Sequence, residues 1–153
     1  KVIGVSDVSG GLYCKDGLDI PAILEYLKTP KALLEGYNAP GVEHITNEQL
    51  LELETTVLVP AALENQIHAG NADKLNCKLI VEAANGPTTV EADEILKKRG
   101  ILLIPDILAN AGGVVVSYFE WVQNIQSMYW TEEDVNNRLK EIMDRAFESV
   151  WNI

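Results

Sequence analysis

The sequence has few of the residues that build metal centres and disulfides. Only two cysteines and two histidines occur among its 153 residues. Cys14 and Cys77 stand far apart and match no metal-ligand spacing. His44 and His68 have no convincing partner, so we expect both in exposed loops. These absences predict two free thiols, no metal site and a cytoplasmic location, where the reducing environment keeps thiols free.

Basic charge and long apolar runs are also scarce. The 12 Lys and Arg residues are outnumbered by 23 Asp and Glu, which gives a formal net charge of −11. Because nucleic acid requires a basic surface, this balance argues against a nucleic-acid partner. No run approaches the roughly 18 apolar residues that cross a membrane, and no signal-peptide pattern is visible. The composition and length are those of a globular protein with one domain.

Short apolar runs alternate with helical segments along the chain. Strands are expected at 2–5, 56–60, 79–81 and 101–104, and Gly10-Gly11 should break the chain after the first. Helices are expected at 19–28, 46–53, 88–99, after Gly113 and at 131–151, from their capping and breaking residues. The stretch 31–43 is expected to run over the surface. Apolar strands separated by helices of about ten residues predict parallel crossovers, and so an open doubly wound α/β fold.

Ligands of such sheets bind beyond the carboxyl ends of the strands. Small residues, glycines, amides or an acid follow each expected strand, namely Asp7, 60–62, 83–87 and 110–113. Small residues let a flat ligand lie against the backbone, and amides supply donors and acceptors. Together these exits predict an extended ligand that crosses the ends of the strands.

Two interpretations remain open for several of these residues. Asp7 suits the acid that binds the adenosine ribose in dinucleotide-binding folds, but it could equally start the turn at Gly10-Gly11. Asn85-Gly86 could be a plain turn. No G-x-G-x-x-G loop precedes the first strand, and Gly10-Gly11 is not that loop because no helix follows it directly.

The start of the helix after residue 110 has similar alternatives. Residues 110–113 could be only a tight start of that helix, although two glycines at a helix N-terminus would also let an anion approach. Ser117 lies one turn into the helix, with Val114 on the same face. The alternative for Ser117 is a surface serine or one that bonds back to the helix.

Six segments, in this order and spacing, carry a resemblance: 16–20, 45–48, 59–67, 81–89, 91–96 and, most specific, Pro105 to Trp121. The last reads PDILANAGGVVVSYFEW and is too long to arise by chance. Together they resemble the NAD(P)-binding domain of the glutamate dehydrogenases, in the Glu/Leu/Phe/Val dehydrogenase family. The resemblance implies oxidation of L-glutamate to 2-oxoglutarate and ammonia, with NAD as cofactor and NADP as the alternative.

The resemblance also assigns residues. The cofactor would be contacted by Asp7, Ala61, Ala62, Gln66, Ala84, Asn85 and Asn110, and the substrate by Val114 and Ser117. Asp7 would hold the adenosine ribose, Asn110 the carboxamide or ribose of the nicotinamide half, and Ser117 the γ-carboxylate of glutamate. A hydroxyl at position 117 favours glutamate over the apolar substrates of the leucine, valine and phenylalanine enzymes.

The same resemblance describes what would be missing. Residues 1–153 would be a fragment of a Rossmann-type domain without its first βα unit, and the N-terminal substrate domain with the catalytic lysines and aspartate would be absent. The chain would then hold no catalytic residue, and alone it should be inactive. The full-length protein would be a homo-oligomer, a hexamer. The alternative is a binding or regulatory module that kept the nucleotide cleft and lost the chemistry.

Overall fold

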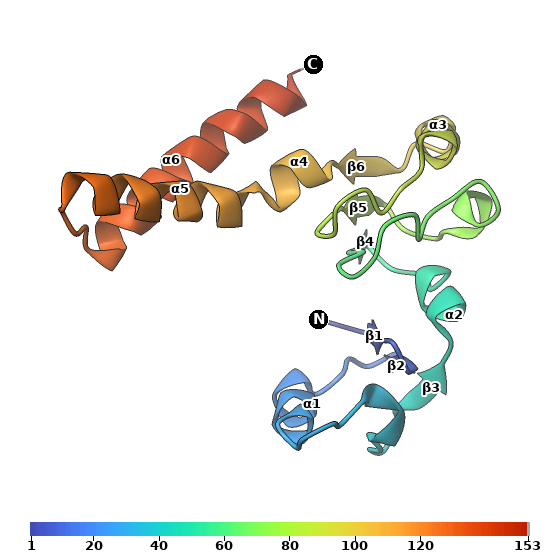
Figure 1. The fold of residues 1–153 in the computed structure, drawn as a ribbon. Helices are drawn as coiled ribbons and strands as arrows, with labels where there is room; N and C mark the ends of the chain where they lie inside the picture. The colour runs from blue at the N-terminus through green and yellow to red at the C-terminus, as the bar shows by residue number, and fades with distance from the viewer. Residues whose placement is uncertain (153) are drawn as a thin grey trace. The chain divides into compact units, whose positions relative to one another are not determined.

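The computed structural model describes residues 1–152. The chain forms two compact units, which we describe separately. Unit 1 contains Lys1–Thr55 and Lys74–Cys77, and unit 2 contains Thr56–Asp73 and the chain from Lys78 on. Figure 1 traces both, with unit 1 in blue to cyan and most of unit 2 in green to red. A 3₁₀ turn, η2 (Ala72–Lys74), lies at one of the points where the chain passes between them.

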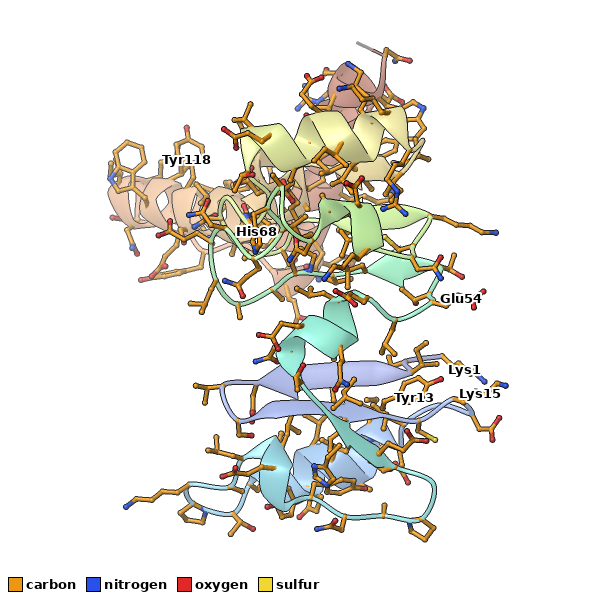
Figure 2. All side chains as sticks on the ribbon, turned by 90° about the vertical axis from the view of Figure 1, so that its right-hand side faces the viewer. Lys1, Tyr13, Lys15, Glu54, His68 and Tyr118 are labelled. Carbon is orange, nitrogen blue, oxygen red and sulfur yellow. The ribbon has the colours of Figure 1, made fainter. Side chains whose placement is uncertain are left out.

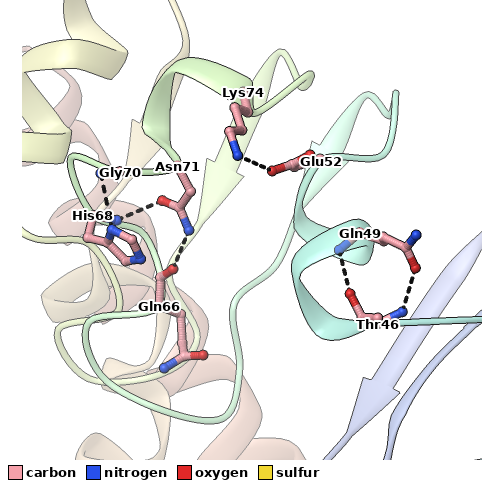
Figure 3. Close-up of polar contacts among 8 residues, drawn as sticks. All are labelled: Thr46, Gln49, Glu52, Gln66, His68, Gly70, Asn71 and Lys74. Carbon is pink, nitrogen blue, oxygen red and sulfur yellow. Dashed lines mark hydrogen bonds and ion pairs between the residues drawn. The ribbon is translucent and has the colours of Figure 1, made fainter.

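Unit 1 is built on an antiparallel sheet. Its elements are β1 (Gly4–Asp7), β2 (Gly10–Tyr13), α1 (Ile20–Leu27), the 3₁₀ turn η1 (Leu34–Gly36), β3 (Glu43–Ile45) and α2 (Asn47–Leu51). The strands are ordered β1-β2-β3. The two predicted helices are confirmed: the Asp19 side chain accepts from the amide of Ala22 at the start of α1, and Thr46 forms a capping box with Gln49 in α2 (Figure 3).

Three predictions for unit 1 are wrong. The strand expected at 2–5 lies at Gly4–Asp7 and pairs antiparallel with β2, not in a parallel sheet. Gly10-Gly11 begins β2 instead of breaking the chain. Gly10 has φ +132°, and a Cβ on Gly11 would meet the Ile45 side chain at 3.1 Å. Glycine is therefore used here for backbone freedom and for close approach of β3.

The third error concerns the stretch 31–43, which was expected to run over the surface. Its residues Leu34 and Tyr37 join Leu12 and Ile23 in a buried apolar cluster. The cluster is the core of unit 1, because α1 and η1 close over one face of a sheet that is only three strands wide.

Unit 2 contains the predicted parallel sheet. Its elements are β4 (Val57–Leu58), β5 (Leu79–Val81), α3 (Val90–Lys98), β6 (Leu102–Ile104), α4 (Asp106–Ala109), α5 (Ala111–Gln126) and α6 (Glu132–Trp151). The strands are ordered β4-β5-β6, and both neighbouring pairs are parallel. Helix α3 connects β5 to β6, starts at the cap Thr89 and ends before Gly100, whose φ is +72°.

Burial is concentrated in the centre of this sheet. Ile80 of β5 and Leu96 of α3 are at most 1% exposed, whereas Val57 of β4 and Leu102 of β6 are 43% and 55% exposed. Strands buried on both faces were expected throughout, but each edge strand has an exposed residue, although Leu58 of β4 is only 6% exposed. In the described sheet β4 and β6 each have one strand neighbour, which leaves Val57 and Leu102 accessible.

The helices after β6 differ from the expected one in their boundaries. Helix α5 begins at Ala111, not after Gly113, so Gly112 and Gly113 lie inside its first turn. The short helix α4 was not predicted. Asn110 ends α4 and directly precedes α5, so it stands at the corner between two helices.

The end of unit 2 is a pair of helices, orange and red in Figure 1. The Thr131 cap of α6 is confirmed as a capping box with Asp134. Phe119 of α5 is 4% exposed and packs on Trp130 with ring centroids 5.5 Å apart, whereas Tyr118 is 57% exposed (Figure 2). Among the described residues, none of the helices is both long and apolar enough to span a membrane, and no cluster of His, Cys, Asp and Glu could hold a metal ion.

Candidate functional site

A cleft of about 530 Å³ lies in unit 2 at the carboxyl ends of its strands. It is lined by Ala62, Ala83, Ala84, Asn85, Asn110, Gly113, Val114 and Ser117. These residues come from the exits of β4 and β5, from Asn110 after α4, and from the first turns of α5. The adjacent parallel strands bring their exits together, as the sequence predicted for this part of the chain.

The cleft residues are mostly small. Ala62, Ala83, Ala84 and Gly113 carry a methyl group or no side chain at all, so a planar ring could approach their backbone closely. Sequence reasoning named Ala62 and Ala84 as site residues. It did not name Ala83 and Gly113, although both stand in the strand exits that it had singled out.

The two amides of the cleft are joined to each other. Nδ2 of Asn110 donates to Oδ1 of Asn85 at 2.8 Å and to the carbonyl oxygen of Ala83 at 3.4 Å. Within residues 1–152, Nδ2 of Asn85 and Oδ1 of Asn110 make no hydrogen bond. The pair therefore keeps an amide donor on Asn85 and an oxygen acceptor on Asn110 for a ligand, and a carboxamide group would require both kinds of partner.

The backbone of the β5 exit is held from two sides. The amides of Ala83 and Ala84 both donate to the carbonyl oxygen of Pro60, at 3.0 and 2.9 Å. On the other side, Oδ2 of Asp106 accepts from the amide of Gly86 at 2.8 Å. The loop that carries Asn85 is thus tied to the exits of both neighbouring strands.

Sequence reasoning missed two acids in this framework. Glu82 is 6% exposed, and its Oε2 accepts from the amide of Asp106 at 3.1 Å. Asp106 links onward to Gly86. The sequence feature that could have indicated them is an acid directly after an apolar strand. A carboxylate buried there is costly unless it accepts a hydrogen bond.

The two residues assigned to the substrate lie on α5. Val114 is 75% exposed and Ser117 is exposed too, and both line the cleft. The Ser117 hydroxyl makes no hydrogen bond within the described part of the chain, so the back-bonding alternative is wrong, whereas its exposure is consistent with the other alternative, a surface serine. It is available to a ligand.

Two predicted cofactor residues of unit 2 do not line the cleft. Ala61 directly precedes the cleft residue Ala62 in the chain, and Gln66 belongs to a loop with its own hydrogen bonds (Figure 3). Nε2 of Gln66 donates to the carbonyl oxygen of Glu64 at 3.0 Å, and the Gln66 carbonyl accepts from Asn71 at 2.8 Å. His68, in the same loop, is exposed as predicted and accepts from the amide of Gly70. His44 is exposed as well, but it lies in β3 rather than in a loop.

Asp7 belongs to unit 1, where its carboxylate organises a turn. Residues 8 and 9 form a two-residue turn between β1 and β2, in which Oδ1 of Asp7 accepts from the amide and hydroxyl of Ser9 at 2.7 and 2.5 Å. Oδ2 accepts from the amide of Leu34 at 2.9 Å. Burial raises the pKa of Asp7, but these hydrogen bonds outweigh it and the pKa is lowered. The turn role is therefore observed, and the ribose role remains an expectation.

Comparison with known proteins identifies the family. The model of the Glutamate/Leucine/Phenylalanine/Valine dehydrogenase family matches residues 1–153. The chain belongs to this family. It is 54% identical over 153 residues to a glutamate dehydrogenase of Thermotoga maritima, and the match covers 100% of this chain and 36% of that protein. It is 52% identical over 151 residues to the catabolic NAD-specific glutamate dehydrogenase RocG of Bacillus subtilis, with 99% and 35% covered.

Other relatives extend this result. The NADP-specific glutamate dehydrogenase of Synechocystis is 50% identical over 159 residues, with 100% of this chain and 37% of that protein covered. Among solved structures, a hetero-hexameric glutamate dehydrogenase of Thermus thermophilus in a Leu-bound form has a TM-score of 0.88 at 30% identity, with 99% and 35% covered. This member of the family therefore spans about a third of the length of the relatives it matches.

Proposed function

We propose that this chain is the NAD(P)-binding part of a glutamate dehydrogenase. Residues 1–153 would form a Rossmann-type domain fragment, without its first βα unit, that works with a substrate domain outside the chain. The reaction converts L-glutamate, NAD(P) and water to 2-oxoglutarate, ammonia and NAD(P)H. The observation that carries the proposal is the cleft of unit 2, which unites most of the residues that the family resemblance assigns to cofactor and substrate.

The amide pair would receive the nicotinamide half of the cofactor. The bound nicotinamide supplies the hydride acceptor of the reaction. Nδ2 of Asn85 and Oδ1 of Asn110 offer the donor and acceptor that its carboxamide requires, and Ala84 leaves room for the ring. Because the two amides are already bonded to each other, they would not have to be ordered when the cofactor binds.

Val114 and Ser117 would form the substrate side of the same cleft. The Ser117 hydroxyl, which has no hydrogen bond within residues 1–152, would donate to the γ-carboxylate of glutamate. A carboxylate removed from water requires donors, and a hydrogen bond to a charged group is worth about 1.5–3 kcal/mol. We assign no proton transfer to this chain, so the groups that exchange protons with the substrate would lie outside it.

The cofactor is proposed to be NAD, with NADP as the alternative. An ionised Asp7 at the ribose would repel a 2′-phosphate, and the lowered pKa of Asp7 keeps it ionised near neutral pH. Relatives with both NAD-specific and NADP-specific names match the chain, so the family alone does not decide. We predict that Asp7→Ser in the complete protein, meaning the natural polypeptide that contains this chain, raises the KM for NAD. An unchanged KM would remove Asp7 from the ribose site.

The remaining proposals concern the assembly and its surroundings. Ala61 and Gln66 would contact the cofactor from beside the cleft. The complete protein would be a hexamer, as one similar structure is described as hetero-hexameric. A cytoplasmic location fits the two cysteines, neither of which forms a disulfide in this chain.

The proposal is tested by comparing the complete protein with the isolated chain. The complete protein should reduce NAD, or NADP, in the presence of L-glutamate, and faster than with leucine, valine or phenylalanine. The isolated chain should show no turnover. Faster oxidation of an apolar amino acid would contradict the glutamate assignment.

Calorimetric titration of the isolated chain addresses the alternative function. A micromolar Kd for NAD or NADP, about 8 kcal/mol of binding free energy, combined with an inactive complete protein, would favour a binding or regulatory module. No heat from the isolated chain, combined with an active complete protein, would support the enzyme assignment.

A further inference from the structure

We propose that Asp106 is a positioning residue that fixes the Asn85–Asn110 amide pair, and that Glu82 in turn holds Asp106. Neither acid lines the cleft, so the role is indirect. The inference rests on the proposed function, in which the amide pair receives the nicotinamide carboxamide. It adds to that function the element that sets the geometry of the pair.

Asp106 is bonded to both sides of the amide pair. Its side-chain Oδ2 accepts from the amide of Gly86, the residue directly after Asn85, at 2.8 Å. Its backbone carbonyl accepts from the amide of Asn110 at 3.0 Å. One residue therefore links the loop after β5 to the corner between α4 and α5, and these are the two segments that carry the amides.

The carboxylate uses its two oxygens for different tasks. While Oδ2 binds Gly86, Oδ1 accepts from the amide of Ile107 at 2.6 Å, in the first turn of α4. A carboxylate is the side chain that can accept in both directions at once without offering a donor. Asparagine would place an NH₂ group against one of the two N–H donors, and serine would be too short to serve both.

Glu82 gives Asp106 a fixed place. It stands at the end of β5, where its amide donates to the carbonyl oxygen of Ile104 at 3.1 Å, and its Oε2 accepts from the amide of Asp106. A buried acid is costly to maintain. Glu82 is 6% exposed and is the only charged residue that is buried in the described part of the chain. Its Oε2 accepts a hydrogen bond from the Asp106 amide.

The Asp106 carboxylate joins Gly86 of the loop to the first turn of α4, in addition to several other supports of the loop. The carbonyl oxygen of Gly86 accepts from the amide of Asn65 at 2.9 Å, and Ala83 and Ala84 are bonded to Pro60. Toward α4, Nδ2 of Asn110 donates to the Ala83 carbonyl at 3.4 Å, and Glu82 accepts from the amide of Asp106. Without the Asp106 carboxylate, Gly86, the residue next to Asn85, would lose its link to α4, and a shift of an ångström would break the 2.8 Å bond between the amides.

The test uses Asp106→Ser in the complete protein, with Asp93→Asn as the matched control. Asp93 is an exposed acid of α3, and its side chain has no hydrogen bond within the described residues. Misplacement of a binding group by about 1 Å can cost about a hundredfold in rate. We expect kcat/KM for the nicotinamide cofactor to fall about ten- to a hundredfold in the serine variant, and the Kd for NADH, from fluorescence titration, to rise.

A double-mutant cycle with Asn85→Ala separates positioning from general damage. If Asp106 acts through Asn85, the double variant should bind NADH no more weakly than the single variant with the lower NADH affinity. The reason is that the effects of substitutions at residues that work as a unit do not add up. Additive losses would overturn the inference. So would an Asp106→Ser protein that matches Asp93→Asn in NADH affinity.

The outcomes keep the two proposals apart. If Asn85→Ala weakens NADH binding but Asp106→Ser does not, the amide pair keeps its role and the Asp106 inference fails. If Asn85→Ala and Asn110→Ala both leave NADH binding unchanged, the pair is not the nicotinamide site, and the proposed function of the cleft fails. Should Asp106→Ser not fold, Asp106→Asn takes its place, since it keeps the size of the side chain and removes one acceptor. The same two criteria then apply.

Discussion

Nδ2 of Asn110 lies 2.8 Å from Oδ1 of Asn85, although 25 residues separate them in the chain. The contact arises because β5 and β6 are parallel neighbours, so their carboxyl ends open at the same edge of the sheet. One hydrogen bond joins the two amides, and Nδ2 of Asn110 also donates to the carbonyl oxygen of Ala83. Nδ2 of Asn85 and Oδ1 of Asn110 make no hydrogen bond within residues 1–152, and in the proposed function they would meet the oxygen and the NH₂ group of the nicotinamide carboxamide.

Removal of one amide should therefore weaken cofactor use more than folding. In Asn110→Ala the cleft loses an acceptor, and Asn85 loses its bonded partner. Truncating one partner of a polar pair costs about 1–3 kcal/mol, so we expect kcat/KM for the cofactor to fall roughly five- to a hundredfold. Initial rates of glutamate oxidation at varied NAD(P) give this value. The control is Asn124→Ala in α5, an exposed asparagine outside the cleft, and an equal effect of both changes would contradict the assignment.

A second prediction concerns the choice of substrate. Ser117→Ala removes the hydroxyl proposed to meet the γ-carboxylate, so the KM for glutamate should rise about tenfold or more, from the 1.5–3 kcal/mol of a hydrogen bond to a charged group. Norvaline serves as an internal control, because it has a similar chain without the carboxylate. Its kinetics should change little in the variant. A similar loss for both substrates would assign Ser117 to packing or folding instead.

The local features of the fold could be predicted from the sequence. Asp19, Thr46, Thr89 and Thr131 start helices where expected, because a capping bond reaches only two or three residues along the chain. The parallel sheet followed from apolar runs joined by helical segments. The cleft followed in part, because small residues and amides after parallel strands must share one edge.

Features that depend on distant contacts could not be predicted. Nothing near Asp7 indicates that its carboxylate accepts from Leu34, 27 residues later. The antiparallel β2 begins with two glycines, which locally favour a turn, and its pairing with β3 depends on the space that Gly11 leaves for Ile45. The tether from Asp106 to Gly86 likewise appears only once the strand exits are adjacent. Tertiary contact overrides local preference at these positions.

The carboxylate of Asp7 should make stability depend on pH in the acid range. Its pKa in the folded protein is lowered from the ordinary value of 3.8. A lowered pKa means that the ionised form of Asp7 stabilises the fold. This stabilisation is fully present at pH values above the unfolded pKa of about 3.9, and it is lost as the pH falls through the pKa of the folded protein. In Asp7→Asn the contribution is absent at every pH.

The measurement is the difference in unfolding free energy between the natural protein and Asp7→Asn, from denaturant titrations at several pH values. The difference should be constant from neutral pH down to about pH 5 and shrink below the ordinary carboxyl pKa of about 4. Asp16→Asn, at an exposed acid of the same unit, controls for the change in net charge. A difference that does not shrink in acid would mean that the charge of Asp7 adds nothing to the fold.

Two glycines allow backbone strain to be separated from function. Gly86 and Gly100 have φ angles of +55° and +72°, and a Cβ on either would meet no atom within 4 Å. Alanine at each position should therefore carry only the conformational cost of the left-handed region, about 1–2 kcal/mol. Scanning calorimetry of the complete protein should then give similar decreases in Tm.

Gly86 alone adjoins Asn85 and donates to Asp106, so relaxation of the strained backbone there would displace the amide pair. We expect kcat/KM for the cofactor to fall in Gly86→Ala and to stay unchanged in Gly100→Ala, and equal kinetics in both variants would mean that the loop tolerates movement without effect on the cofactor.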